Sequence, residues 1–122
     1  RICTTIDLGE SWKEHPTSRR ALVEPTCMAS LHRHEYMEEG KKKSMLLFVN
    51  PNNYGTRDNL TLKVSFDDGM TWPEEHWILF DQYRSTGYSC ITSIDENSIG
   101  ILYESSQSDL AFIKINLIEI LK

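Results

Sequence analysis

The sequence predicts an all-β chain built of repeated four-stranded units, and three observations lead to this fold class. Short segments of β-branched, aromatic and other apolar residues recur along the chain, two turn-forming octets share one pattern, and the only helical segment is short and terminal. Of the 122 residues, 39% are hydrophobic and 25% are charged, which is the composition of a folded globular domain. The length allows one ordinary domain at most.

The strands are expected to follow one another along the whole chain. The first covers residues 1–5. In residues 60–65 apolar and polar side chains alternate, which is typical of a strand with one buried face. The stretches between strands are polar or contain turn-forming residues. The other predicted strands are Cys27–His34, Ser44–Val49, Leu60–Ser65, Trp77–Gln82, Tyr88–Ile94, Ser98–Tyr103 and Leu110–Asn116, and the terminal helix is Leu117–Lys122.

The two octets are TIDLGESW, at residues 5–12, and SFDDGMTW, at residues 65–72. Both contain Asp at the third position, Gly at the fifth and Trp at the eighth, with hydroxyl residues at the first and seventh. The carboxylate is expected to accept backbone N–H bonds across a hairpin turn, and glycine supplies a backbone angle that other residues resist. The indole would then cover the turn. These structural positions are Asp7, Gly9 and Trp12 in the first octet and Asp67, Gly69 and Trp72 in the second.

The two octets begin 60 residues apart, at residues 5 and 65. Eight strands divided between two octets give about two four-stranded units, and four-stranded units that repeat at about this spacing are the blades of a β-propeller. A closed propeller needs at least about four blades. We therefore expect the chain to be part of a longer protein, an expectation that its first residue, Arg1, also favours.

Charge and cysteine content exclude several classes of protein. The formal net charge of −5 argues against binding to nucleic acid or to an anionic membrane, and no apolar run approaches the length of a spanning helix. Cys3, Cys27 and Cys90 lie among apolar or small residues, so buried free thiols are expected rather than a disulfide. No cysteine spacing fits a zinc site, and no cofactor is predicted.

The octets resemble the Asp box of the sialidases, six-bladed propeller enzymes that remove terminal sialic acid. Three further segments, Asn50–Gly69, Ser85–Cys90 and Ser98–Glu104, match the C-terminal part of the sialidase catalytic domain in their order. The segment Leu22–Leu31 is also similar to bacterial members of the family. The resemblance covers essentially the whole chain and implies that the chain is part of a retaining exo-sialidase. It also implies that this part is inactive on its own, and that its partners are a sialylated glycan and the remaining blades of the propeller. It also implies a secreted or periplasmic location.

Three residues match functional positions of that family. Arg57 matches the third arginine of a triad that clamps the substrate carboxylate, and a guanidinium suits a carboxylate because it can form two parallel charge-assisted bonds. Tyr88 matches the catalytic nucleophile, and Glu104 matches a carboxylate that orients another triad arginine. The alternatives are an Arg57 paired with Asp58, a tyrosine that only packs, and a glutamate that faces water.

Other features point less clearly to function. His32 and His34 could begin a metal site, but no third ligand stands at a recognisable spacing, so a solvent-facing strand is expected. Glu24 has no expected role beyond a strand-edge or turn position. No motif matches the family's general acid/base, its tyrosine-activating glutamate or its other two arginines. The alternative function is a non-catalytic Asp-box propeller that binds glycans or proteins, although such a module has no reason to keep all three matched residues.

Overall fold

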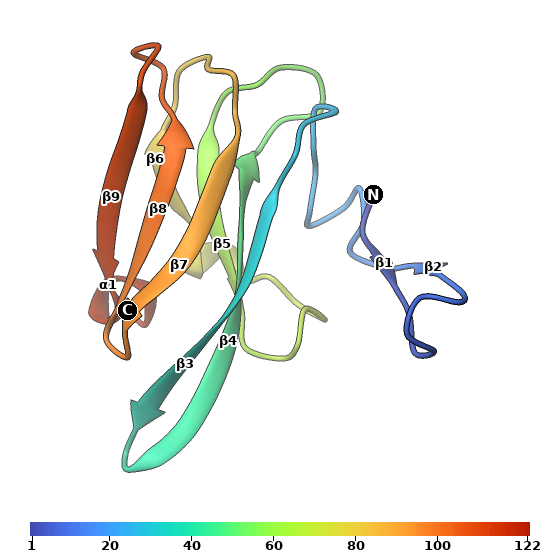
Figure 1. Cartoon of the computed structure of the whole chain (residues 1–122), viewed down its shortest axis with the longest axis vertical. Helices are drawn as coiled ribbons and strands as arrows, with labels where there is room; N and C mark the ends of the chain where they lie inside the picture. Colours follow the sequence, from blue (N-terminus) through green and yellow to red (C-terminus); the bar gives the residue numbers. More distant parts are fainter.

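The computed structural model describes residues 1–122 as three antiparallel sheets in which each strand pairs with the next one along the chain (Figure 1). A ribbon of two short strands comes first, followed by a four-stranded and a three-stranded sheet. The strands are β1 (Cys3–Thr4) and β2 (Lys13–Glu14), then β3 (Ser30–Glu38), β4 (Lys41–Pro51), β5 (Leu60–Ser65) and β6 (Ile78–Asp81), then β7 (Ser89–Asp95), β8 (Ser98–Glu104) and β9 (Leu110–Asn116); the helices are a 3₁₀ turn, η1 (Glu74–His76), and α1 (Leu117–Ile120).

The all-β fold is confirmed, but the strands are divided differently from the prediction. Only one sheet has four strands, and the second octet joins its third and fourth strands, β5 and β6. The first octet joins β1 and β2, so these two strands flank their turn as β5 and β6 flank the second one. The chain thus contains a two-stranded ribbon, one four-stranded sheet and one three-stranded sheet.

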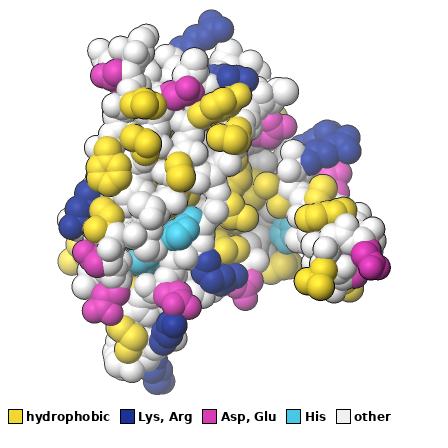
Figure 2. Space-filling model, viewed as in Figure 1, with side chains coloured by type: hydrophobic (Ala, Val, Ile, Leu, Met, Phe, Trp, Pro, Cys, Tyr) yellow, Lys and Arg dark blue, Asp and Glu magenta, His cyan; other side chains and the backbone are white.

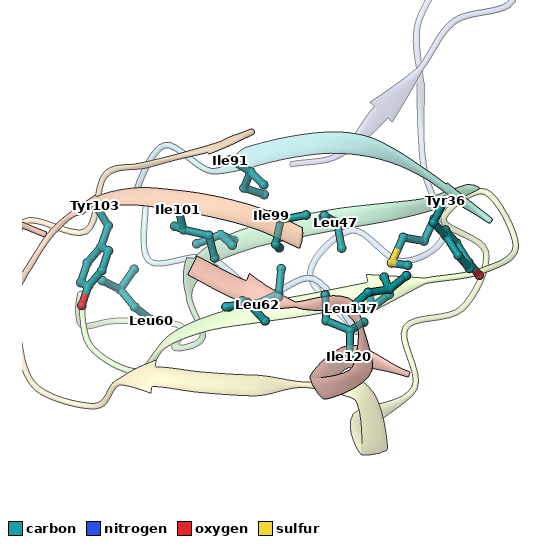
Figure 3. Packing of buried hydrophobic residues seen from close by; sticks show 14 residues of the cluster. Tyr36, Leu47, Leu60, Leu62, Ile91, Ile99, Ile101, Tyr103, Leu117 and Ile120 are labelled. Atoms are coloured by element: carbon teal, nitrogen blue, oxygen red, sulfur yellow. The ribbon is translucent and has the colours of Figure 1, made fainter. Parts of the chain in front are cut away.

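The main core lies between the four-stranded and the three-stranded sheet. Side chains from β4 and β5 meet those from β7, β8 and β9, and α1 closes one end of the cluster (Figure 3). Burying each large aliphatic side chain stabilises the fold by about 1.5–3 kcal/mol. The fully buried members include Leu47, Val49, Leu60, Leu62, Val64, Ile99 and Ile101.

A smaller cluster lies on the opposite face of the four-stranded sheet. It contains Leu22, Phe48 and Trp72, with the Phe48 and Trp72 rings packed edge to face at 6.0 Å. On the same face the buried Lys63 donates from its Nζ to the carbonyl of Ala21 at 2.6 Å and lies 4.1 Å from the centre of the Trp77 ring. The segment of residues 15–29 is thereby held against the sheet.

The two ends of the sheets carry different connections (Figure 1). The loops that join β4 to β5, β6 to β7 and β8 to β9 lie at one end, which we call the loop end. The second octet lies at the opposite end, between β5 and β6. No helix of the structure is long and apolar enough to cross a membrane.

One expectation about burial was wrong, and the two octet tryptophans differ in burial. All three cysteines are free, as expected, but Cys3 and Cys90 are exposed and Cys27 is only half-buried. Cys90 lies on a sheet face that no other element covers. Trp72 is buried whereas Trp12 is 61% exposed, because the short ribbon of β1 and β2 offers its indole no sheet to pack on.

Candidate functional site

The structure brings Arg57, Tyr88 and Glu104 together at the loop end. Arg57 lies in the loop between β4 and β5, Tyr88 directly precedes β7, and Glu104 is the last residue of β8. Arg57 Cζ is 5.6 Å from the centre of the Tyr88 ring. Glu104 Oε2 accepts a hydrogen bond from the Tyr88 N–H at 3.2 Å, and the Glu104 N–H donates to the Tyr88 carbonyl at 3.0 Å.

The guanidinium of Arg57 is fixed by backbone carbonyls rather than by a carboxylate. Nη1 donates to the carbonyl of Thr86 at 2.9 Å, and Nη2 donates to that of Thr26 at 3.1 Å. The ion pair with Asp58 considered as an alternative is not formed, since that carboxylate accepts bonds from Asn53, Thr56 and Asn59. A guanidinium has five N–H groups. Arg57 therefore keeps its charge and most of its donors available to an anion.

Gly87 allows the loop before β7 to pass close to Arg57. Its φ is +90°, and a Cβ at this position would lie 2.9 Å from Pro51 Cγ and 3.1 Å from Cys27 Sγ. Any other residue would therefore clash as well as strain the backbone. The close approach places the Thr86 carbonyl on the guanidinium and Tyr88 beside it.

The Tyr88 side chain is 43% exposed, and its hydroxyl makes no hydrogen bond within the chain. The guanidinium of Arg57 lies against the ring in a cation–π contact that does not use the phenolic oxygen. This is not a tyrosine whose hydroxyl is used in packing the fold. Its oxygen is available to a ligand that reaches the loop end.

A polar cavity of about 460 Å³ lies beside this group, between the loops that precede β7 and follow β8. Glu104, which is partly buried, forms part of its wall. The cavity has room for a further charged group next to the Glu104 carboxylate. Its lining residues are Arg84, Ser85, Thr86, Glu104, Ser105, Ser108, Asp109 and Leu110.

Both octets form the expected turn, with closely similar hydrogen bonds. Asp7 accepts from the N–H and hydroxyl of Ser11 at 2.9 and 2.5 Å, and Asp67 accepts from those of Thr71 at 2.8 and 2.6 Å. The indole N–H groups donate to the carbonyls of Gly9 and Gly69. Bonds from Ser11 and from Thr71 hold the pKa of the two carboxyl groups below the usual range. These local bonds account for the carboxylates as parts of the turns.

The interpretation of β3 as a solvent-facing strand was wrong for its histidines. His34 is fully buried, and its Nδ1 lies 2.8 Å from Ser93 Oγ, which is also 2.8 Å from His32 Nε2. Burial lowers the pKa of His32, and the neighbouring His34 lowers it further. The sequence could not reveal this cluster, because Ser93 belongs to β7 of the next sheet. The structure contains no group of three side chains that could hold a metal ion.

Sequence reasoning missed Lys63 and expected no more of Glu24 than a strand-edge or turn position. Glu24 Oε2 accepts a hydrogen bond from the Cys27 N–H at 3.2 Å and so closes the turn that carries Thr26. Lys63 contacts Ala21 and Trp77, as described above. The proline after Glu24 is a turn signal, but neither partner of Lys63 is marked by any local pattern.

Comparisons with known proteins agree with the sequence resemblance. No family model matches the chain. The chain is 45% identical over 121 residues to a sialidase of Bacteroides fragilis (strain YCH46), covering 99% of this chain and 22% of the relative. It is 31% identical over 106 residues to a sialidase of Micromonospora viridifaciens, covering 85% of this chain and 16% of the relative.

A solved structure gives the same result. The Hadza microbial sialidase Hz136 matches 97% of this chain and 23% of its own, with a TM-score of 0.85 and 44% identity. The chain thus spans about a fifth of the length of the curated relatives it matches. In sequence and in fold, the chain is similar to one portion of these sialidases.

Proposed function

We propose that this chain is the C-terminal part of the catalytic domain of a retaining exo-sialidase, which hydrolyses terminal sialic acid from glycoconjugates. The observation that carries the proposal is the juxtaposition of Arg57, Tyr88 and Glu104 at one end of the sheets. Three distant parts of the sequence, at the spacing found in sialidases, converge on an exposed phenol beside a guanidinium that has no carboxylate partner.

Each of the three residues has a role in the proposed reaction. Arg57 binds the carboxylate of sialic acid through its free N–H groups. Glu104 orients an arginine from another part of the longer protein, for which the cavity beside its carboxylate has room. Tyr88 supplies the nucleophilic oxygen.

A phenol suits this substrate because the anomeric carbon of sialic acid itself bears a carboxylate. An anionic nucleophile would be repelled by that charge, whereas a neutral phenol is not. The Tyr88 oxygen forms a bond to the anomeric carbon as the glycosidic bond breaks. The phenol loses its proton to a base, and the leaving oxygen gains one from an acid, both on parts of the protein beyond this chain. Water then displaces the tyrosine and restores the original configuration.

The test is the substitution Tyr88→Phe in the full-length protein, assayed with a fluorogenic sialoside. We expect most turnover to be lost while binding of sialic acid is largely kept, because the change deletes the nucleophilic oxygen and retains the ring. Tyr83→Phe is the matched control, since Tyr83 is also exposed and precedes the same strand. Normal turnover in Tyr88→Phe, or a wild-type protein that binds sialosides without cleaving them, would contradict the proposal.

A further inference from the structure

We infer that Glu24 is a positioning residue for Arg57, acting through the backbone of the turn between them. This inference rests on the proposed function only in assigning Arg57 to a substrate carboxylate. The sequence alone assigned Glu24 no role in the site. The structure connects it to the guanidinium in three steps.

The first step is the contact between Arg57 and the Thr26 carbonyl, at 3.1 Å from Nη2. The second carbonyl that holds the Arg57 guanidinium is that of Thr86, in the loop before β7. The two carbonyls approach the two terminal nitrogens separately, so together they fix the plane of the guanidinium. Loss of either one leaves the planar group free to rotate about the remaining bond. A bidentate carboxylate bond depends on that plane.

The second step is the backbone conformation that aims the Thr26 carbonyl. Thr26 has a φ of +53°, in the left-handed region that β-branched residues rarely adopt. Such a conformation persists only where the surrounding structure enforces it. Pro25, which is buried, constrains the preceding residue toward extended backbone and fixes its own φ. A further restraint is needed on the other side of Thr26.

The third step is that restraint, which the Glu24 side chain supplies. Its Oε2 accepts the N–H of Cys27 at 3.2 Å, so a ring that runs from Glu24 to Cys27 closes around Pro25 and Thr26. Its Oε1 takes no part in the turn. The Glu24 side chain is only 31% exposed, so water competes weakly for the Cys27 N–H. Removing the carboxylate would leave Thr26 free to relax and its carbonyl to turn away from Arg57.

The test compares three variants of the full-length protein. Binding of N-acetylneuraminic acid is measured by titration calorimetry. We expect Glu24→Ala to weaken binding about tenfold, and Glu24→Gln to bind nearly as well as the wild type, because an amide oxygen can still accept the Cys27 N–H. Glu35→Ala is the matched control, since Glu35 pairs with Lys42 and both side chains are exposed. It should bind as the wild type does.

A second background separates positioning from general destabilisation. In an Arg57→Ala protein, Glu24→Ala should cause no further loss of affinity, because the side chain it acts through is gone. An equal loss in both backgrounds, or wild-type affinity in Glu24→Ala, would overturn the inference. A crystal structure of Glu24→Ala gives a readout independent of the ligand. An unchanged contact between Arg57 and Thr26 there would overturn the inference, whereas failure of the wild type to bind the acid would overturn the proposed function instead.

Discussion

At the scale of single residues, Arg57 shows how a charged side chain can be fixed without being neutralised. A carboxylate partner would hold the guanidinium but would also compete with an anionic ligand. Carbonyl oxygens hold it through their dipoles and leave its net charge in place. The ring of Tyr88 adds a third contact of the same kind, since an aromatic face attracts a cation without carrying charge. The site is thus prepared for an anion before one arrives.

The substitution Arg57→Lys should raise KM for a sialoside about tenfold or more in the full-length protein, with a smaller change in kcat. An ammonium cannot keep two carbonyl contacts and also bind both oxygens of a carboxylate. Steady-state kinetics check this expectation. Arg33→Lys is the control, because Arg33 pairs with Asp68 far from the loop end. An unchanged KM in Arg57→Lys would count against the clamp.

Lys63 is held in a different way, since its ammonium is buried against one carbonyl and one aromatic ring. Burial lowers its pKa to about 8, and the charge of Glu74 opposes this only in part. In the unfolded chain the ordinary value of 10.5 applies. Between pH 8 and pH 10.5 the unfolded state therefore binds more protons than the folded state, and the free energy of unfolding rises with pH.

We expect that rise to amount to about 3 kcal/mol at most and to be absent from Lys63→Met. Urea unfolding of the full-length protein at pH 7.5 and at pH 10 measures it as a difference between variant and wild type, which cancels the titration of other lysines and tyrosines. If both proteins changed stability equally over this range, Lys63 would not be the group responsible.

Residues that stand in motifs are predicted better from the sequence than residues whose partners come from other elements. Arg57, Tyr88 and Glu104 stand in motifs whose order along the chain carries the resemblance, so their meeting could be expected. Lys63 and His34 looked like ordinary strand residues, because their partners, Ala21 and Ser93, come from other elements. A local pattern contains no information about such partners.

At the scale of elements, the two Asp-box turns show one local structure in two environments. Their hydrogen bonds run between residues at most four positions apart, so the pattern could be predicted from the octets alone. Whether the indole is buried could not be predicted from the octet, because burial depends on the neighbouring sheet. Trp72 packs on Phe48, whereas Trp12 finds no such partner in this chain.

The substitution Trp72→Ala should destabilise the four-stranded blade by about 3–5 kcal/mol, because it empties the space between Leu22 and Phe48. Trp72→Phe is the matched control and should cost less, since it keeps a ring in contact with Phe48. Thermal unfolding of the full-length protein gives both values. Equal melting temperatures for the two variants would show that the ring does not hold the blade.

Strand positions were predicted well and their grouping less well. Strand periodicity and the octets locate β3 to β9 within a few residues. The number of strands in each sheet differs from the prediction of about two four-stranded units, because the 60-residue offset between the octets fixes the repeat but not its starting point. The second octet follows the third strand of its sheet, whereas the first has only β1 and β2 beside it.

At the scale of the whole molecule, hydrophobic side chains gather on the outer face of β7, β8 and β9 (Figure 2). Leu102 pairs with Cys90 on one side and with Phe112 on the other, and Ile94 and Leu110 extend the same surface. Exposed apolar patches of this kind mark surfaces that another element covers. Propeller blades pack face to face, so the proposed further blades of the longer protein account for this face.

The isolated 122-residue chain should therefore show no hydrolysis of a fluorogenic sialoside above background. The site in this chain offers the proposed nucleophile and one proposed clamp arginine, but the acid and base that the proposed reaction requires have no candidates here. A continuous assay at high protein concentration is the measurement, with the full-length protein as the positive control. Turnover comparable with that control would refute the expectation.

The division of the site between two sheets also predicts how the proposed activity would be lost on heating. Arg57 lies in a loop of the four-stranded sheet and Tyr88 directly precedes the three-stranded one, and polar links such as Ser30 to Ile91 and His34 to Ser93 cross the boundary. A slip of one sheet against the other would separate guanidinium from phenol with every strand still intact. On heating, inactivation should then precede the loss of β-structure in circular dichroism, so the activity would report displacement of the two sheets before either one unfolds.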